Sequence, residues 1–231
     1  MAVHRKRPRS YALGRRAESQ AETRQRIVEA TVELHGTIGP VRTTISAIAE
    51  KAAVQRLTVY RHFPDERSLL EACSSHARAL MPVPDAAAWR AIADPEARVR
   101  TALRELYAYF RRTEGFWVNV LRDAELSPIV REMAAERRFG YLTVVRDTLA
   151  AGWRRRSARL IAALGHAVDF RTWESLTVRQ GLNDVQAVDL MLAFVRCTSR
   201  ASASGPRKKT QPAAGVRGEV AGRSQRPRPR T

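Results

Sequence analysis

The side chains from Gln55 to Thr58 have the chemistry needed to read the edges of base pairs. An arginine such as Arg56 can donate two hydrogen bonds to guanine, and a glutamine such as Gln55 can pair with adenine, in the major groove of duplex DNA. Leu57, or the methyl group of Thr58, can touch the methyl group of thymine. One well-formed bidentate pair discriminates against a wrong base by about 1–3 kcal/mol. These four residues are therefore candidates for sequence-specific contact with DNA.

The segment 43–63 predicts two short helices joined by a tight turn. Thr43 is a good N-cap for the first helix, because its hydroxyl can accept a free backbone N–H. The buried face of that helix consists of Ile45, Ile48, Ala49 and Ala52. The chain then turns, and a second helix runs from Gln55 to Arg61. If Val54 and Val59 face inward, the four candidate residues remain outside, which is the pattern of a helix-turn-helix.

Residues 24–72 resemble the DNA-binding domain of TetR-family transcriptional regulators. The resemblance rests on the pair Thr43-Thr44, the run I-A-E-K-A-A-V, the run T-V-Y-R-H-F-P-D, and Leu69-Leu70 after it. Members of this family usually repress transcription as homodimers, and a divergent C-terminal helical domain binds a small-molecule inducer. The resemblance also implies that Tyr60 and His62 lie against the DNA backbone, where contacts hold register rather than read sequence.

Several of these assignments have a plainer alternative. Thr44 stands at a helix start, where free N–H groups favour a phosphate, but Thr43 and Thr44 also suit a purely local capping role. Tyr60 is either a backbone contact or a half-buried core aromatic. His62 is either a phosphate contact or a packed histidine. The sequence leaves these alternatives open.

Two positions depart from the family pattern. Ala53 stands where the turn usually has glycine, so a positive φ there would cost about 1 kcal/mol. Glu66 stands where a lysine near a phosphate is common, and a carboxylate repels phosphate. Arg67 is the candidate substitute for that contact.

Both ends of the chain are strongly basic. The formal net charge is +18, and residues 1–26 contain eight Lys/Arg against two acidic residues. Residues 200–231 contain nine Lys/Arg against one acidic residue. Such ends attract any polyanion without choosing among them. We expect 1–19 to be a disordered basic arm, either in a minor groove or merely solubilising, and 199–231 to be a disordered basic tail.

The remaining chain predicts an all-α fold, with a helix-turn-helix domain over 20–66 and an antiparallel helical bundle over 67–198. In the bundle, Gly115 is expected to end one helix, 157–176 to form a single helix, and Asp184 to begin the last one. The candidate walls of a mostly apolar ligand pocket are Tyr107, Phe110, Phe116, Trp117, Leu121, Tyr141 and Trp153. The two last helices would form a dimer interface through Trp173, Val188, Leu192 and Val195.

The sequence offers little for other classes of protein. Cys73 and Cys197 are far apart, and no zinc spacing occurs, so we expect no metal, no disulfide framework and a cytoplasmic location. No uninterrupted apolar run predicts a membrane span, and no catalytic motif or cofactor site is evident. An Arg-rich organelle transit peptide is the alternative interpretation of the N-terminus.

The interpretation that fits best is a ligand-responsive, sequence-specific DNA-binding regulator, a repressor acting as a homodimer. The alternative is a sequence-tolerant nucleic-acid-binding protein driven by its basic ends.

Overall fold

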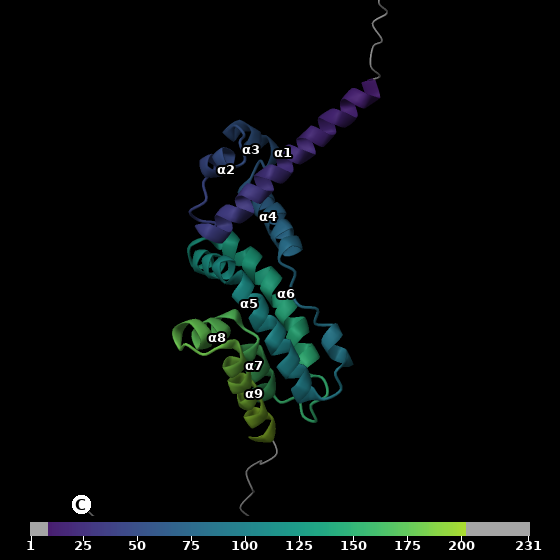
Figure 1. The fold of residues 1–231 in the computed structure, drawn as a ribbon, viewed down its shortest axis with the longest axis vertical. Coiled ribbons are helices and arrows are strands. Elements are labelled where there is room, and N and C mark those ends of the chain that lie inside the picture. Colours follow the sequence, from purple (N-terminus) through teal and green to yellow (C-terminus); the bar gives the residue numbers. More distant parts are fainter. Residues whose placement is uncertain (1–8, 202–231) are drawn as a thin grey trace, which may run out of the picture.

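The computed structural model describes residues 9–201, with the side chains of 9–16, 137–139, 200 and 201 left out (Figure 1). The described part confirms an all-α fold, with a small N-terminal helical domain stacked on a C-terminal bundle. Its α-helices are α1 (Arg9–Thr37), α2 (Ile45–Lys51), α3 (Arg56–His62), α4 (Glu66–Leu80), α5 (Pro95–Leu126), α6 (Pro128–Ala150), α7 (Ala158–Ala167), α8 (Phe170–Glu174) and α9 (Asp184–Ala201). A 3₁₀ turn, η1 (Ala88–Ala91), precedes α5, and a π-helical turn, η2 (Ser175–Arg179), follows α8. None of these helices is long and apolar enough to cross a membrane.

Helix α1 begins earlier than the sequence pattern indicated. It runs for 29 residues from Arg9, so residues 9–19 are helical rather than part of a disordered arm. Its first half is rich in Arg, Glu, Gln and Ala, which are good helix formers even without an apolar face. Figure 1 shows this half projecting beyond α2 and α3. Residues 1–8 and 202–231, the remainder of the predicted basic ends, lie outside the described residues, while 199–201 complete α9.

The N-terminal domain has a core of its own. Ile27 of α1, Ile48 of α2 and Val59 of α3 are at most 1% exposed and pack together. Helix α4 joins this core through Leu69, while its next residue, Leu70, packs on Val130 and Met133 of α6. The predicted domain boundary at residue 66 therefore falls at the start of a helix that serves both domains.

The C-terminal bundle is built on the long antiparallel pair α5 and α6 (Figure 1). The prediction that Gly115 ends a helix was wrong, because α5 continues through it to Leu126. Glycine costs about 1 kcal/mol relative to alanine inside a helix, which tertiary packing readily offsets. Helix α5 passes close to α1 here, since a β-carbon at Gly115 would lie 3.6 Å from the carbonyl oxygen of Gly36.

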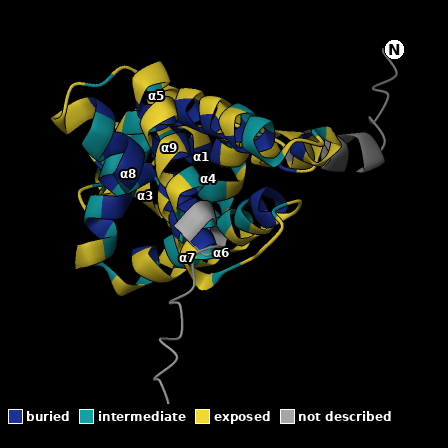
Figure 2. Ribbon diagram, turned by 90° about the horizontal axis from the view of Figure 1, so that it is seen from below, coloured by how far each residue is buried: buried dark blue, intermediate teal, exposed yellow. Residues whose placement is uncertain are grey.

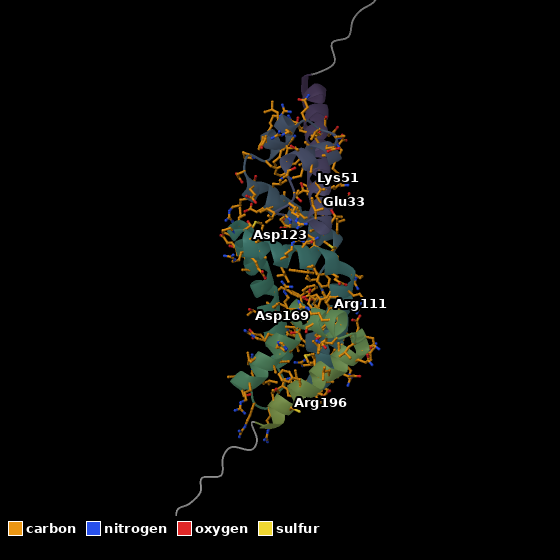
Figure 3. All side chains as sticks on the ribbon, turned by 90° about the vertical axis from the view of Figure 1, so that its left-hand side faces the viewer. Glu33, Lys51, Arg111, Asp123, Asp169 and Arg196 are labelled. Atoms are coloured by element: carbon orange, nitrogen blue, oxygen red, sulfur yellow. The ribbon has the colours of Figure 1, made fainter. Side chains whose placement is uncertain are left out.

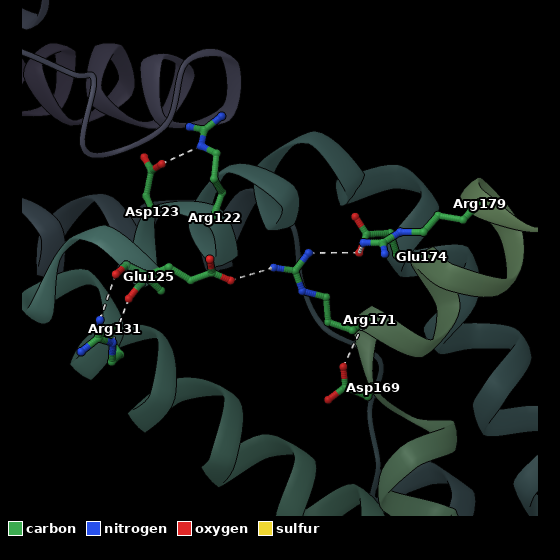
Figure 4. Close-up of polar contacts among 9 residues, drawn as sticks. Arg122, Asp123, Glu125, Arg131, Asp169, Arg171, Glu174 and Arg179 are labelled. Carbon is green, nitrogen blue, oxygen red and sulfur yellow. Dashed lines mark hydrogen bonds and ion pairs between the residues drawn. The ribbon is translucent and has the colours of Figure 1, made fainter.

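The expected single helix over 157–176 is broken in the structure. Helix α7 ends at Ala167, and Asp169 caps a new helix by accepting the backbone N–H of Arg171 at 2.7 Å. Figure 4 shows that Arg171 also pairs with Glu174 of α8 and reaches Glu125 at the end of α5. An aspartate immediately before the first residue of a helix is a common N-cap, and the apolar periodicity of the sequence did not reveal it.

Helix α9 closes the bundle against α5 and α7. Arg111 of α5 donates bidentate hydrogen bonds to the carboxylate of Asp184 at 2.9 and 2.8 Å, and Arg196 pairs with Glu96. Both arginines are labelled in Figure 3. Figure 2 shows buried residues on the inner sides of the helices and exposed residues on their outer sides.

This packing buries the residues of the predicted dimer interface within their own chain. Within the single chain, Trp173 and Val195 are 0% exposed, Leu192 is 1% and Val188 is 2%. A side chain with no accessible surface cannot contact a second subunit. The apolar face of α9 that the sequence reveals is therefore its inner face, covered by its own bundle.

Candidate nucleic-acid interface

Helix α3 separates its residues cleanly into an inner and an outer side. Val59 is 0% exposed and Phe63, just after the helix, is 2% exposed, so both belong to the core. On the outer side, Leu57 is 74% exposed, and Gln55 and Arg56 are also exposed. The backbone of Gln55 is extended, so the helix begins one residue later than expected. The predicted base-reading residues thus lie on the surface of the second helix of a helix-turn-helix.

The other outward residues of α3 are partly tied to the protein. Thr58 is half-buried, and the guanidinium of Arg61 donates to its hydroxyl at 3.5 Å. Tyr60 is 47% exposed, so it is a surface aromatic rather than a core one. His62 is half-buried, and burial, Arg61 and Arg24 together lower its pKa. The neutral imidazole is thereby favoured.

The turn between α2 and α3 contains the strain that the sequence suggested. Ala53 has a φ of 51°, in the left-handed region that favours glycine and is strained for alanine. The backbone N–H of Val54 donates to the carbonyl of Ala49 at 2.9 Å, and that of Ala53 to Glu50 at 3.1 Å. These bonds hold the turn against a cost of about 1 kcal/mol. Val54, expected inside, is half-buried.

The capping residue of α2 is Thr44, not Thr43. The Thr44 hydroxyl accepts the backbone N–H of Ala47 at 3.1 Å. The Thr43 hydroxyl donates instead to the carbonyl of Gly39 at 2.8 Å, which ties it to the preceding loop. Two adjacent threonines offered the same cap chemistry, and the loop geometry decided between them.

Contacts from α1 brace the helix-turn-helix from behind. Arg26 donates to the carbonyl of Ala52 at 3.1 Å, next to the strained turn. Lys51 at the end of α2 pairs with Glu33, and Figure 3 shows the two side by side. The Arg24 guanidinium lies over the Phe63 ring at 4.7 Å. Helix α1 therefore holds the end of α2, next to the turn, and the end of α3.

The start of α4 departs from the expected phosphate contact. Asp65 caps the helix by accepting the backbone N–H of Ser68 at 2.7 Å, and Glu66 follows it. Arg67, the expected substitute, instead donates to Glu132 of α6 at 2.8 Å. The Arg67 guanidinium therefore forms an ion pair between α4 and α6.

Three polar residues of α5 hold the loop that leads into α2. Asn119 donates to the carbonyl of Gly36 at 2.9 Å, and Arg122 donates to that of Ile38 at 2.9 Å. Asp123 is 1% exposed and accepts the backbone N–H of Val41 at 2.9 Å, while pairing with Arg122 (Figure 4). We call Asn119, Arg122 and Asp123 the loop clamp.

A cavity of about 530 Å³ lies where α1, α4, α5 and α6 meet. Four of the seven predicted pocket residues line it: Phe110, Phe116, Trp117 and Tyr141. The other three serve elsewhere. Tyr107 is fully buried and donates to the carbonyl of Ala167, Trp153 donates to that of Leu149, and Leu121 is a core residue.

The N-terminal helices α1 and α4 also contribute to this cavity, which the sequence pattern did not predict. His35 of α1 and Leu70, Cys73 and Ala77 of α4 also line it. The apolar pattern of α4 was the sequence signal for this contribution. The apolar face of α4 is too wide to be buried in a single core, and Leu69 and Leu70 pack in two different hydrophobic clusters.

Burial favours the neutral forms of two titratable groups in the cavity wall, His35 and Tyr109. Burial lowers the pKa of His35 to about 4, against a smaller opposing effect of Asp123. The imidazole Nδ1 lies 3.2 Å from the sulfur of Cys73. Burial also raises the pKa of Tyr109. Arg78 and Glu136, the charged residues among the described lining, are exposed.

Comparisons with known proteins match this architecture. The family model described as "Bacterial regulatory proteins, tetR family" matches residues 27–73. No curated protein matches the chain significantly in sequence.

Solved structures match over most of the chain. A putative TetR-family transcriptional regulator from Mesorhizobium loti is 16% identical, with 79% of this chain and 97% of that one covered and a TM-score of 0.57. AibR, solved with isovaleryl coenzyme A and operator DNA, is 19% identical, with 74% and 97% covered and a TM-score of 0.53. The TetR-family regulator PfmR from Thermus thermophilus is 20% identical, with 75% and 97% covered and a TM-score of 0.51. Residues 27–73 therefore match the TetR-family model, and the chain has the all-helical fold of solved TetR-family transcriptional regulators.

Proposed function

We propose that this protein is a ligand-responsive, sequence-specific DNA-binding repressor that acts in the cytoplasm as a homodimer, without catalytic activity. The observation that carries the proposal is the outer face of α3. Gln55, Arg56 and Leu57 are exposed there, while Val59 anchors the helix in the core. A helix of this kind fits the major groove and presents hydrogen-bonding and apolar groups to base edges.

The remaining contacts serve the DNA backbone. Tyr60 and His62 flank the base-reading face, and Thr43 and Thr44 stand at the start of α2. Contacts of this type fix the protein on the duplex and carry no direct sequence information. The basic ends add salt-sensitive attraction.

A homodimer requires an apolar surface that the single chain leaves open. On α9, Leu190 is 46% exposed and Phe194 is 43% exposed, one helical turn apart on the same face. The ring of His166 on α7 meets the Phe194 ring edge-on, with centroids 6.1 Å apart. We therefore assign the dimer surface to these outward faces of α7 and α9, in place of the buried residues. Two helices from each subunit then form a four-helix bundle.

The cavity is the proposed inducer site. Its walls are mostly apolar and its inner titratable groups are neutral, so a charged ligand group would lose its hydration without a partner. We therefore infer a mostly apolar, uncharged ligand. Helix α4 lines the cavity and also packs in the DNA-binding domain, so a ligand that shifts α4 also shifts α3.

The proposal is tested by selecting bound duplexes from a random library at physiological salt. We expect a near-palindromic site with half-sites about 34–36 Å apart, one helical turn. Arg56→Ala and Tyr60→Ala should each weaken binding to that site, whereas Arg104→Ala, an exposed arginine of α5, should not. Unchanged binding by both of the first two variants would refute the assignment of α3.

The basic ends favour one rival function, a sequence-tolerant nucleic-acid binder. Deletion of residues 1–8 and 202–231 separates the two. A regulator keeps its site preference and loses salt-sensitive affinity, whereas a tolerant binder loses nearly all affinity.

A further inference from the structure

Leu57 has the highest exposed fraction, 74%, among the large apolar side chains that the structure describes as exposed. It is the second residue of α3 and follows Gln55 and Arg56. A single exposed leucine on a protein surface is ordinary by itself. This leucine, however, stands in the middle of the polar face that meets DNA in the proposed function.

The core does not account for Leu57. Val59 and Phe63 already provide the apolar anchors of α3, at 0% and 2% exposure. Leu57 belongs to none of the described hydrophobic clusters. Its side chain therefore contributes little to folding and is free to meet a partner.

The chemistry of the major groove defines that partner. Among the four bases, thymine alone presents an apolar group there, the 5-methyl group. The charged neighbours Arg56 and Arg61 favour a polyanion such as DNA over an apolar protein surface.

Thr58 is the competing candidate for an apolar contact with thymine. It is half-buried, and its hydroxyl accepts a hydrogen bond from Arg61. Its methyl group is therefore less available than the side chain of Leu57.

We propose that Leu57 reads the methyl group of a thymine in each operator half-site. This inference rests on the proposed function, because it requires α3 to lie in the major groove. It assigns Leu57 a role in specificity rather than in folding.

Replacement of thymine by uracil removes only that methyl group, so it provides the test. The full-length protein is first used to select its preferred duplex. Each thymine of one half-site is then replaced singly by deoxyuridine, and dissociation constants are measured at fixed salt. One replacement should weaken binding by about fourfold, the factor expected for one buried methyl-sized group. Other replacements should have little effect.

Three variants identify the side chain that senses the methyl group. Leu57→Ala should bind the thymine and uracil duplexes equally. Thr58→Ser, which removes only the competing methyl, should retain the fourfold preference for thymine. Leu126→Ala, which shortens a 68% exposed leucine at the end of α5, should also retain it.

The outcomes separate this inference from the function on which it rests. A selected site at which no uracil replacement matters overturns the role of Leu57 and leaves the regulator intact. Persistence of the thymine preference in Leu57→Ala, or its loss in Thr58→Ser, also overturns it. Failure to select any site overturns both. Circular dichroism of Leu57→Ala should match that of the unmodified protein, because the side chain lies outside the core.

Discussion

The carboxylate of Asp123 accepts the backbone N–H of Val41 at 2.9 Å and so joins the C-terminal end of α5 to the loop that precedes the DNA-reading unit. Asp123 lies on α5, 82 positions further along the chain. At Gly39, two residues before Val41, a β-carbon would overlap the side chains of Arg122 and Asp123. The close approach of loop and helix thus depends on a glycine with φ of 93°.

Removal of this carboxylate should destabilise the protein. In Asp123→Ala, the Val41 N–H and the Arg122 guanidinium both lose a partner in a largely buried site. We expect a loss of about 1–3 kcal/mol in the free energy of unfolding, measured by urea denaturation. Asp147→Ala, at an exposed pair with Arg146, should change it by less than about 0.5 kcal/mol. Equal losses of unfolding free energy in the two variants would show that Asp123 of the loop clamp stabilises the protein no more than an exposed ion pair does.

Relief of the strained turn should stabilise the protein. Ala53→Gly removes the steric cost at φ of 51°, and the gain exceeds the added backbone entropy of glycine. We expect about 0.5–1 kcal/mol of added stability, again from urea denaturation. Ala47→Gly, within α2, should instead cost about 1 kcal/mol. Alanine-to-glycine substitution should thus raise the free energy of unfolding at position 53 and lower it at position 47. A loss of stability in Ala53→Gly would contradict backbone strain at Ala53.

Protonation of His35 should weaken the fold in mild acid. Its pKa is about 4 in the folded protein against the ordinary value of 6.5 for histidine, so the unfolded chain binds the proton first as pH falls. Its contribution to stability is therefore complete above pH 6.5 and is lost progressively towards pH 4. Between pH 7.5 and pH 5 the loss is about 2 kcal/mol.

Urea midpoints at these two pH values measure this effect. His35→Gln should show a pH dependence that is flatter by that amount, whereas His76→Gln, outside the described lining of the cavity, should keep the dependence of the unmodified protein. Parallel pH profiles for His35→Gln and the unmodified protein would exclude a neutral, buried His35.

A charge on the outward face of α9 should dissociate the dimer. In Phe194→Glu, two carboxylates would be brought into an apolar interface, where their desolvation and mutual repulsion oppose association. We expect a monomer by sedimentation velocity and weaker binding to the operator. Val144→Glu is the matched control, since Val144 of α6 is 47% exposed on a different helix. A dimer that persists in Phe194→Glu would place the interface elsewhere.

The reading unit was largely predictable, because it is short and its local signals agree. Val59 at the inner side of α3 and the glycine-to-alanine departure at Ala53 both follow from a motif with fixed spacing. The cap of α2 was displaced by one residue, since Thr43 and Thr44 have the same chemistry. Only the carbonyl of Gly39, brought near by the loop, distinguishes them.

The bundle was less predictable, because helical periodicity identifies a buried face without identifying what covers it. Trp173 and Leu192 were assigned to a partner subunit, yet their own chain buries them. The cavity depends on His35 and Cys73, which are 38 positions apart and meet only through tertiary packing. No local pattern brings such residues together.

Helix α4 has one row of side chains in each of two cores, and this limits how the protein can respond to a bound ligand. A helix held on only one side can tilt and let loose neighbours absorb the movement. Here Leu69 packs in the N-terminal core, and Leu70 both lines the cavity and packs on Val130 and Met133, so a displacement of Leu70 also moves the adjacent Leu69. When a ligand occupies the cavity, the whole DNA-reading unit should accordingly rotate as a rigid body between two orientations. It should not become gradually more flexible.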